Sequence, residues 1–381
     1  MKKYFINMLL LLGATVFTFP ILELATRIFI DPIDYLMPTL LEDKVFGITI
    51  KPKSAGHDAL GFRNKEVPKK VDVVTIGDSM TYGYSASFYN SWPLQFEKMT
   101  NFKVYNAAIG GWGPHQYFCA IKKYALPLNP KSIIIGLYLG NDLLDAYKYK
   151  SIDCELNLKY AGSDEIPIVS PHNRIFGNLR DWLSRNSVFY QLLKYNLGDL
   201  GNYLSMVLAK IHATNTTHES IIVDNQRIKG VFEPRMINNL DISTLEVKTG
   251  LNLTVGLLSK MQSVCKENNI SCFFLLIPTK ESVYSKALKK IDQNNTDTYK
   301  PIYETAKLET KIRTTLKENL KSHIEFIDPL ANMQERIALS SLYPLSNDIH
   351  PNVNGYYWIA WEVSRLVGKK FQHITDLPPS N

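Results

Sequence analysis

Apolar positions along the chain fall into short continuous runs, separated by longer stretches with helical spacing. The runs predict five buried strands, over residues 73–76, 103–106, 132–139, 272–277 and 324–327. The stretches between them predict helices over residues 92–99, 114–124, 244–267, 303–320 and 356–367. Continuous apolar or β-branched runs are typical of strands buried on both faces of a sheet. Because the strands alternate with helices, we predict a three-layer α/β/α fold around a central parallel sheet.

The N-terminus carries a different pattern, an uncharged run over residues 4–22. As a helix this run would match a hydrocarbon layer of about 30 Å. A cleaved signal peptide is the alternative, but no A-x-A cleavage pattern follows the run. Lys2 and Lys3 precede it and favour a cytoplasmic N-terminus. We therefore expect residues 1–30 to hold an uncleaved transmembrane helix, a single pass that leaves the catalytic domain outside the cytoplasm.

Three further segments follow from composition and rhythm. Residues 31–70 are rich in Pro, Gly and Lys and predict a connector along the surface of the next domain, which we expect over residues 71–375. Residues 148–238 interrupt the alternation of strands and helices and exceed ordinary loop lengths, which predicts an inserted, mostly helical subdomain or lid. Apolar residues within it recur at helical spacing over 188–211. This helix could pack on the core, which we favour, or lie on a membrane surface.

Charge and cysteine content narrow the functional classes. The net charge of +7 suits ordinary solubility or an anionic partner such as lipid or acidic glycan. No aromatic-interleaved basic patch points to nucleic acid. The four cysteines lack metal-ligand spacing, so no metal site is expected. Cys265 and Cys272 flank a short loop and would form either a disulfide or two separately buried thiols, of which we favour the second.

Four polar blocks near the strand ends are the candidate chemistry. They read GDSM over 77–80, NAAIGGWG over 106–113, GLYLGND over 136–142 and NDIHPNVNG over 347–355. Ser79 directly follows the first predicted strand, and the carboxyl ends of parallel strands face the crevice where ligands bind. A serine becomes a nucleophile when a base removes its proton, and histidine suits that task.

In these four blocks the chain resembles the SGNH, or GDSL-type, hydrolases, a family named after Ser, Gly, Asn and His. The resemblance extends over roughly residues 61–360, apart from the insertion. It implies a flavodoxin-like fold and a serine hydrolase acting on esters, without cofactor or metal. It also implies Ser79 as nucleophile and His350 as base. The oxyanion donors would be the backbone N–H groups of Ser79 and Gly111 and the side chain of Asn141.

The acidic partner departs from the commonest pattern of that family, which places Asp three residues before the histidine. Asn347 stands there, so Asp348, two residues before His350, is our candidate to orient the base. A backbone carbonyl is the alternative. We expect Lys280 to lie on a loop after the fourth strand, on the same rim as Ser79. The candidates for substrate contact are Asp78, Trp112 and Lys280, with a core position for Trp112 and a solvated ion pair for Lys280 as alternatives.

Together these features predict a membrane-anchored serine esterase or deacylase that acts on an acylated glycan or lipid outside the cytoplasm. A polysaccharide O-acetyltransferase with the same Ser–His–Asp set is a second hypothesis, because the sequence does not distinguish water from a sugar hydroxyl as acceptor. A non-enzymatic envelope binding protein is a third, and the presence of all four block residues weighs against it. The sequence leaves the acyl group and the oligomeric state open.

Overall fold

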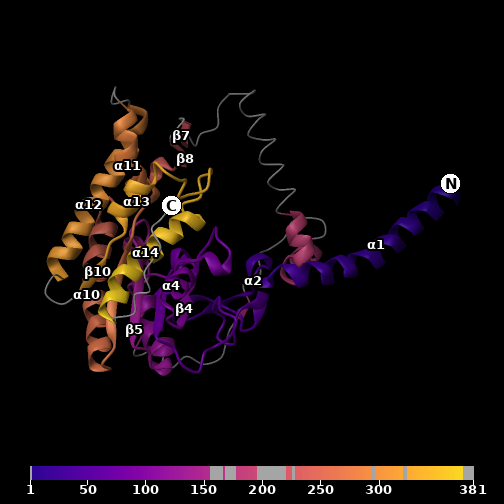
Figure 1. Ribbon diagram of the computed structural model, residues 1–381, viewed down its shortest axis with the longest axis horizontal. Coiled ribbons are helices and arrows are strands. Elements are labelled where there is room, and N and C mark those ends of the chain that lie inside the picture. Colours follow the sequence, from indigo (N-terminus) through magenta and orange to yellow (C-terminus); the bar gives the residue numbers. More distant parts are fainter. Residues whose placement is uncertain are drawn as a thin grey trace.

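Five parallel strands form the central sheet in the computed structural model, in the spatial order β10-β9-β5-β3-β4 (Figure 1). The structure describes residues 2–154, 166–167, 177–194, 220–224, 228–292, 297–320 and 324–371. The strands are β3 (Val73–Gly77), β4 (Val104–Ala108), β5 (Ser132–Tyr138), β9 (Ser271–Ile277) and β10 (Glu325–Ile327). All five predicted strands and their parallel pairing are confirmed. Counted along the chain, their order is the 2-1-3-4-5 order of flavodoxin-like folds.

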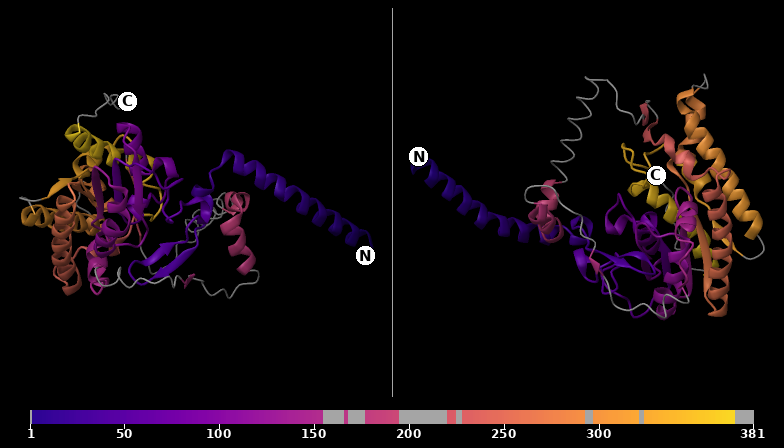
Figure 2. Two further views of the ribbon diagram at one scale, coloured as in Figure 1. Left: turned by 90° about the horizontal axis from the view of Figure 1, so that it is seen from below. Right: turned by 180° about the vertical axis from the view of Figure 1, so that it is seen from behind.

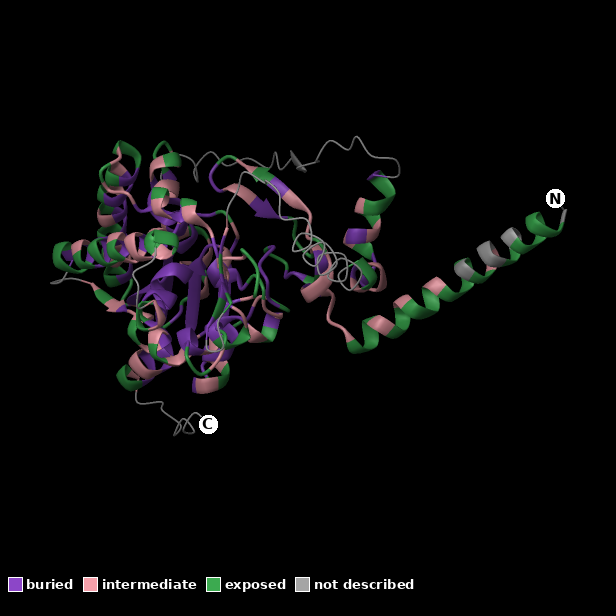
Figure 3. Ribbon diagram, turned by 90° about the horizontal axis from the view of Figure 1, so that it is seen from above, coloured by how far each residue is buried: buried purple, intermediate pink, exposed green. Residues whose placement is uncertain are grey.

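Helices cover both faces of this sheet, which lies buried between them (Figure 3). The predicted helices are confirmed as α4 (Trp92–Thr100), α5 (Pro114–Ala120), α10 (Leu245–Glu267), α12 (Lys300–Leu320) and α14 (Val353–Lys370). A wider helical turn over Ile121–Ala125 extends α5 to the predicted end. In β5, Ile133 and Ile135 pack with α5 and α10, whereas Ile134 packs on the opposite face with α4 and α14. Successive strand residues point to opposite faces, so a continuous apolar run serves both layers.

From residue 71 onward and outside the insertion, four of the described α-helices were not among those predicted from the sequence. They are α3 (Ser79–Tyr82), α6 (Asp142–Lys148), α11 (Lys280–Ile291) and α13 (Leu330–Arg336). Of these, α11 replaces the loop that we expected around Lys280. The side chain of Thr279 accepts a hydrogen bond from the backbone N–H of Ser282 and so caps this helix. Lys280 therefore begins a buried helix rather than a solvated rim.

Residues 31–70 belong to the fold itself, which corrects the expected surface connector. After α2 (Pro32–Tyr35), the strands β1 (Leu40–Asp43) and β2 (Gly47–Ile50) form an antiparallel pair. Phe46 and Phe62 are fully buried in the same cluster as the central sheet. Arg63 is buried as well and pairs with Asp34 at 2.9 Å. Apolar residues scattered among Pro, Gly and Lys therefore complete the core.

Only parts of the insertion at 148–238 are described. They include β6 (Ile166–Pro167), which pairs with β1, helix α8 (Gly177–Asn186), and the antiparallel pair β7 (Ile221–Asp224) and β8 (Lys229–Phe232). Of the helix predicted over 188–211, residues 188–194 are helical, and the rest lies outside the described residues. Phe232 at the end of β8 is buried in the core.

The N-terminal segment forms one long helix, α1 (Lys2–Phe29), which extends away from the sheet (Figure 1, Figure 2). Among the residues that the structure describes, no helix is both long and apolar enough to cross a membrane. The predicted transmembrane helix is therefore not supported. The last turns of α1 make polar contacts with protein, because Glu23 pairs with Arg27 and accepts hydrogen bonds from the backbone N–H groups of Val188 and Phe189.

Of the cysteines, Cys119 in α5 forms a disulfide with Cys154, which no sequence spacing predicted. Cys265 and Cys272 are both buried and free. The pair therefore forms two buried thiols rather than a disulfide, as we favoured, but the two thiols lie in contact rather than apart. The disulfide joins helix α5 to the start of the insertion.

Candidate active site

Ser79 stands where β3 ends, at the first position of α3. Asp78 caps this helix by accepting a hydrogen bond from the backbone N–H of Met80 at 2.9 Å. The turn needs glycine at position 77, because a Cβ there would lie 2.2 Å from Thr81 Oγ1 and 3.0 Å from the carbonyl oxygen of Gly136. Ser79 thus points from the carboxyl edge of the sheet, at the reversal of strand order between β3 and β5, which is the usual ligand crevice of such folds.

His350 and Asp348 meet Ser79 at this edge, although 271 residues separate His350 from Ser79. His350 Nε2 lies 2.9 Å from Ser79 Oγ, and His350 Nδ1 lies 2.7 Å from Asp348 Oδ1. The same Asp348 oxygen accepts a hydrogen bond from the backbone N–H of His350 at 2.9 Å. With an acceptor on Nδ1 and a serine hydroxyl at Nε2, the imidazole is oriented to take a proton from that hydroxyl.

The carboxylate of Asp348 is ionised in this setting. Burial alone would raise its pKa, but hydrogen bonds from His350 and Ser85 outweigh burial and hold the pKa at about 2. Ser85 donates its hydroxyl to Asp348 Oδ2. Ser85 could not be predicted from the sequence, because nothing in the local pattern connects it to a residue 263 positions away. A negative Asp348 stabilises the imidazolium that forms when His350 accepts a proton.

Lys280 holds the loop that carries these two residues. Its ammonium donates to the backbone carbonyl oxygens of Pro344, Ser346 and Asp348 at 3.3, 2.8 and 3.2 Å. The side chain is almost fully buried, and burial lowers its pKa to about 8. We had considered a substrate contact or a solvated ion pair for Lys280. Its ammonium instead points at the backbone of the histidine loop, and its side chain is buried. It is a positioning residue for the segment that leads to His350.

Behind Lys280, a buried charge cluster fixes the start of α11. Glu309 in α12 accepts hydrogen bonds from the backbone N–H and the hydroxyl of Thr279, at 3.1 and 2.5 Å. Arg313 pairs with Glu309 and with Asp328, each at 2.6 Å. Because the charges are paired and hydrogen-bonded, the cluster tolerates burial. The contacts thus run from α12 through the cap of α11 to the histidine loop.

The predicted oxyanion donors follow the carboxyl ends of the three neighbouring strands β3, β4 and β5. Gly111 adopts φ +86°, a left-handed conformation that favours glycine, and it is exposed in a turn after β4. Asn141 follows β5, and its Nδ2 lies 3.4 Å from Asp78 Oδ2. An amide nitrogen carries two hydrogens, so one remains for a ligand. The backbone N–H of Ser79 belongs to the first turn of α3, where no helical carbonyl can accept it.

Asp78 lies below this cluster rather than in contact with a substrate. It is fully buried, and burial raises its pKa to about 6, although the Met80 N–H and His350 counteract that effect. The neighbouring Asp142 is also fully buried, and burial raises its pKa well above the usual value. Asp142 accepts a hydrogen bond from the hydroxyl of Tyr117 at 2.7 Å. These carboxyl groups brace the turns, so substrate contact by Asp78 is corrected to a capping role.

Trp112 is likewise placed in the core. Its side chain is fully buried, stacks on Phe46 at 4.8 Å between ring centroids, and donates its indole N–H to the carbonyl of Ile48. The wall beside the base is formed instead by Tyr84, whose ring meets His350 edge-on at 5.3 Å. A Cβ at Gly110 would lie 2.8 Å from the Tyr84 ring. Glycine at 110 thus lets Tyr84 stand between the Gly111 turn and His350.

No metal site competes with this arrangement in the part of the chain that the structure describes, where no cluster of His, Cys, Asp or Glu could hold a metal ion. The geometry suits nucleophilic attack by a serine and stabilisation of an oxyanion.

Comparison with solved structures finds similarity to esterases and lipases of the GDSL type over about 80% of the chain. A lipolytic G-D-S-L family protein from Desulfitobacterium hafniense is 15% identical and has a TM-score of 0.36, over 78% of this chain and 99% of that one. A GDSL-like lipase from Bacteroides thetaiotaomicron is 12% identical and has a TM-score of 0.37, over 80% and 91% of the two chains.

A catalytic mutant of an acetylxylan esterase from Geobacillus stearothermophilus is 12% identical and has a TM-score of 0.37, over 79% and 96% of the two chains. No model of a protein family matches this chain, and no curated protein matches it.

Proposed function

We propose that this protein is a serine esterase, or deacylase, of the SGNH type. The observation that carries the proposal is the continuous set of hydrogen bonds from Asp348 through His350 to Ser79, at the carboxyl edge of the sheet. Buried hydrogen bonds also position these three residues, because Lys280 holds the loop that carries His350. Such preorganisation is what acyl transfer by a serine requires.

In the proposed reaction, Ser79 Oγ attacks the ester carbonyl carbon while His350 Nε2 takes the hydroxyl proton. The developing oxyanion accepts hydrogen bonds from Ser79 N–H, Gly111 N–H and Asn141 Nδ2, each of which lowers the barrier by about 3 kcal/mol in comparable sites. His350 then gives its proton to the leaving alcohol oxygen. A water molecule then gives a proton to His350 Nε2 and attacks the acyl carbonyl carbon. The bond from that carbon to Ser79 Oγ breaks, the acid leaves, and His350 returns the proton to Ser79 Oγ.

We further propose that this chemistry takes place outside the cytoplasm, on an acylated glycan or lipid. The disulfide between Cys119 and Cys154 supports this, because disulfides persist in oxidising compartments. We also propose that residues 4–22 hold the protein at a membrane. The support is that apolar side chains of α1 are largely exposed, Leu10 at 67% and Phe17 at 77%. Their transfer into lipid would be favourable.

A fluorophosphonate probe tests the nucleophile. We expect one covalent adduct on the full-length protein by intact mass, and none on Ser79→Ala. Equal labelling of both proteins would refute the assignment. Incubation with an acetylated glycan, with and without a sugar acceptor, then identifies the acceptor by mass. Free acetate supports the esterase, whereas transfer to the sugar would make the protein an acetyltransferase.

Location is tested separately. Membrane fractions are washed with alkaline carbonate and the retained protein is sequenced from its N-terminus. We expect retention with Met1 to Lys3 intact. A mature start near residue 25, or complete release into the wash, would refute attachment through residues 4–22.

A further inference from the structure

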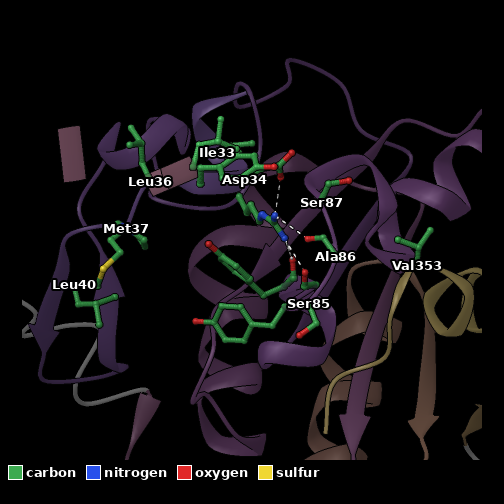
Figure 4. Close-up of a pocket in the computed structure, with 16 residues that line it drawn as sticks. Ile33, Asp34, Leu36, Met37, Leu40, Ser85, Ala86, Ser87 and Val353 are labelled. Carbon is green, nitrogen blue, oxygen red and sulfur yellow. Dashed lines mark hydrogen bonds and ion pairs between the residues drawn. The ribbon is translucent and has the colours of Figure 1, made fainter. Parts of the chain in front are cut away.

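A cavity of about 840 Å³ lies next to the candidate triad, and most of its lining residues have no role in the site described above. One wall comes from residues 33–40, which directly follow α1, and the opposite wall from the loop over 82–87, which follows α3. Figure 4 shows Leu36, Met37 and Leu40 along the first wall and Ser85 on the second. A volume of this size falls in the range of ligand pockets, about 300–1,000 Å³.

The lining suits an uncharged, mostly apolar ligand. Its two charged side chains neutralise each other, because Arg63 pairs with Asp34 at 2.9 Å. Arg63 also donates to the backbone carbonyls of Gly83 and Ala86, at 2.8 and 3.1 Å (Figure 4). The buried Nε of Arg63 has no hydrogen-bond partner among the described residues. The cavity therefore has mostly apolar walls and no unpaired charge, which suits an apolar ligand.

The cavity borders the triad on the side of the base. Tyr84 and Ser85 both line the cavity. The ring of Tyr84 meets His350 edge-on, and the hydroxyl of Ser85 donates a hydrogen bond to Asp348. Val353, three residues after His350, also lines it. Ser79 does not. In ester cleavage by a serine, the histidine hands its proton to the leaving oxygen, so the leaving alcohol must lie against the base. A cavity on this side therefore faces the alcohol part of the substrate.

We propose that this cavity binds the aliphatic alcohol portion of an ester substrate, with the acyl group directed to the opposite side of Ser79. The inference rests on the proposed esterase function and narrows its substrate to esters of apolar alcohols. Residues 33–40, which bore no functional motif in the sequence, thereby become determinants of specificity.

Two ester series test this assignment. One keeps the acetyl group and lengthens the alcohol from ethyl to decyl, and the other keeps a methyl alcohol and lengthens the acyl chain. Each methylene buried in the cavity is worth about 0.8 kcal/mol, or about fourfold in kcat/KM. We expect kcat/KM to rise with the alcohol chain by up to that factor per methylene until the cavity is filled. A rise confined to the acyl series, or no rise in either, would overturn the proposal.

A matched pair of variants locates the effect. Met37 lines the cavity and is 46% exposed, so Met37→Asp introduces charge there without burying it in the core. We expect this substitution to lower the ratio of kcat/KM for decyl acetate over ethyl acetate at least tenfold. The control is Leu245→Asp, at an exposed apolar position in the first turn of α10 and outside the lining. If kcat/KM rises equally with alcohol chain length in Met37→Asp and in wild type, the proposal is contradicted.

Binding without turnover separates this inference from the proposed function. Isothermal titration calorimetry of decyl acetate into Ser79→Ala should give a complex with negative heat-capacity change, and adding Met37→Asp should weaken it at least tenfold. If wild type cleaves no ester but this binding pattern appears, the cavity assignment stands and the esterase fails. If esters are cleaved but Ser79→Ala binds no decyl acetate, the esterase stands and the cavity assignment fails.

Discussion

Replacing Lys280 with methionine should disable the site without unfolding the protein. The ammonium of Lys280 donates to the three backbone carbonyls of residues 344, 346 and 348, and it is the main polar support of the segment leading to His350. Methionine fills a similar volume but donates nothing. The segment should therefore relax and carry His350 away from its 2.9 Å contact with Ser79.

The expected sizes of the two effects differ. A misplacement of about 1 Å in a catalytic group costs roughly 100-fold in rate, so kcat should fall by about that factor. Stability should change little, because two terms oppose each other. Hydrogen bonds from a charged donor contribute about 1.5–3 kcal/mol each. Burial lowers the pKa of Lys280 to about 8, which means that holding the charged form costs about 3 kcal/mol. We expect a net loss below about 2 kcal/mol.

Steady-state kinetics and urea unfolding of both proteins measure these quantities, and pH adds an independent signal. The folded pKa of Lys280 lies below its unfolded value near 10.4. The unfolded chain therefore binds more protons between about pH 8 and 10.4, and this group makes wild type gain stability across that window. Over the same rise kcat should fall, because the neutral amine has two hydrogens for three carbonyls. Lys280→Met should show neither trend.

The control is Lys286→Met, which removes an exposed lysine from the same helix. It should match wild type in kcat and in both pH trends. A kcat for Lys280→Met within about threefold of wild type would refute the positioning role, since a displaced base should cost far more. A collapse of the stability of Lys280→Met by more than about 4 kcal/mol would instead assign Lys280 to the fold.

Three further perturbations probe the surroundings of the site and the fold. Asp348→Asn should lower kcat by about 10⁴-fold because the amide favours the wrong histidine tautomer, whereas Asn347→Ala should leave kcat nearly unchanged, and equal losses would contradict the assignment. Burial raises the pKa of Glu281 to about 7, so wild type should lose about 3 kcal/mol of stability as pH rises from 4.5 to 7, and Glu281→Gln should abolish that slope in urea unfolding. Reducing the Cys119–Cys154 disulfide, which closes a 35-residue separation, should lower the free energy of unfolding by about 4 kcal/mol, and an unchanged urea midpoint would refute this.

The local pattern of apolar residues was sufficient to predict the strands of the central sheet. After an initial serine, the runs that became β5 and β9 contain only apolar or aromatic residues and one glycine, and such runs have few alternatives besides a doubly covered strand. The placement of Asp348 beside His350 was also a local matter, because a spacing of two residues lets one carboxylate reach both the backbone N–H and the ring.

Contacts between distant segments could not be predicted in the same way. A lysine such as Lys280 is usually solvated. Here it is a buried donor because residues 344–348, distant in sequence, pack against it. Trp112 sits between glycines in a block that carries chemistry, yet Phe46 from β1–β2 encloses it. The short strands of that pair mix polar with apolar residues and show no clear period. Each of these misses reflects a partner far away in sequence.

The junction between α1 and the sheet has almost no slack. Only two residues separate Phe29 from α2, and Asp34 in α2 is tied through Arg63 to the turn that follows the nucleophile helix. Glu23 binds the described part of the insertion from the other side. Whatever fixes α1 in space therefore also fixes the direction in which Ser79 faces. If residues 4–22 attach the protein to a membrane as proposed, Ser79 would act close to that surface, because no long linker separates α1 from the sheet.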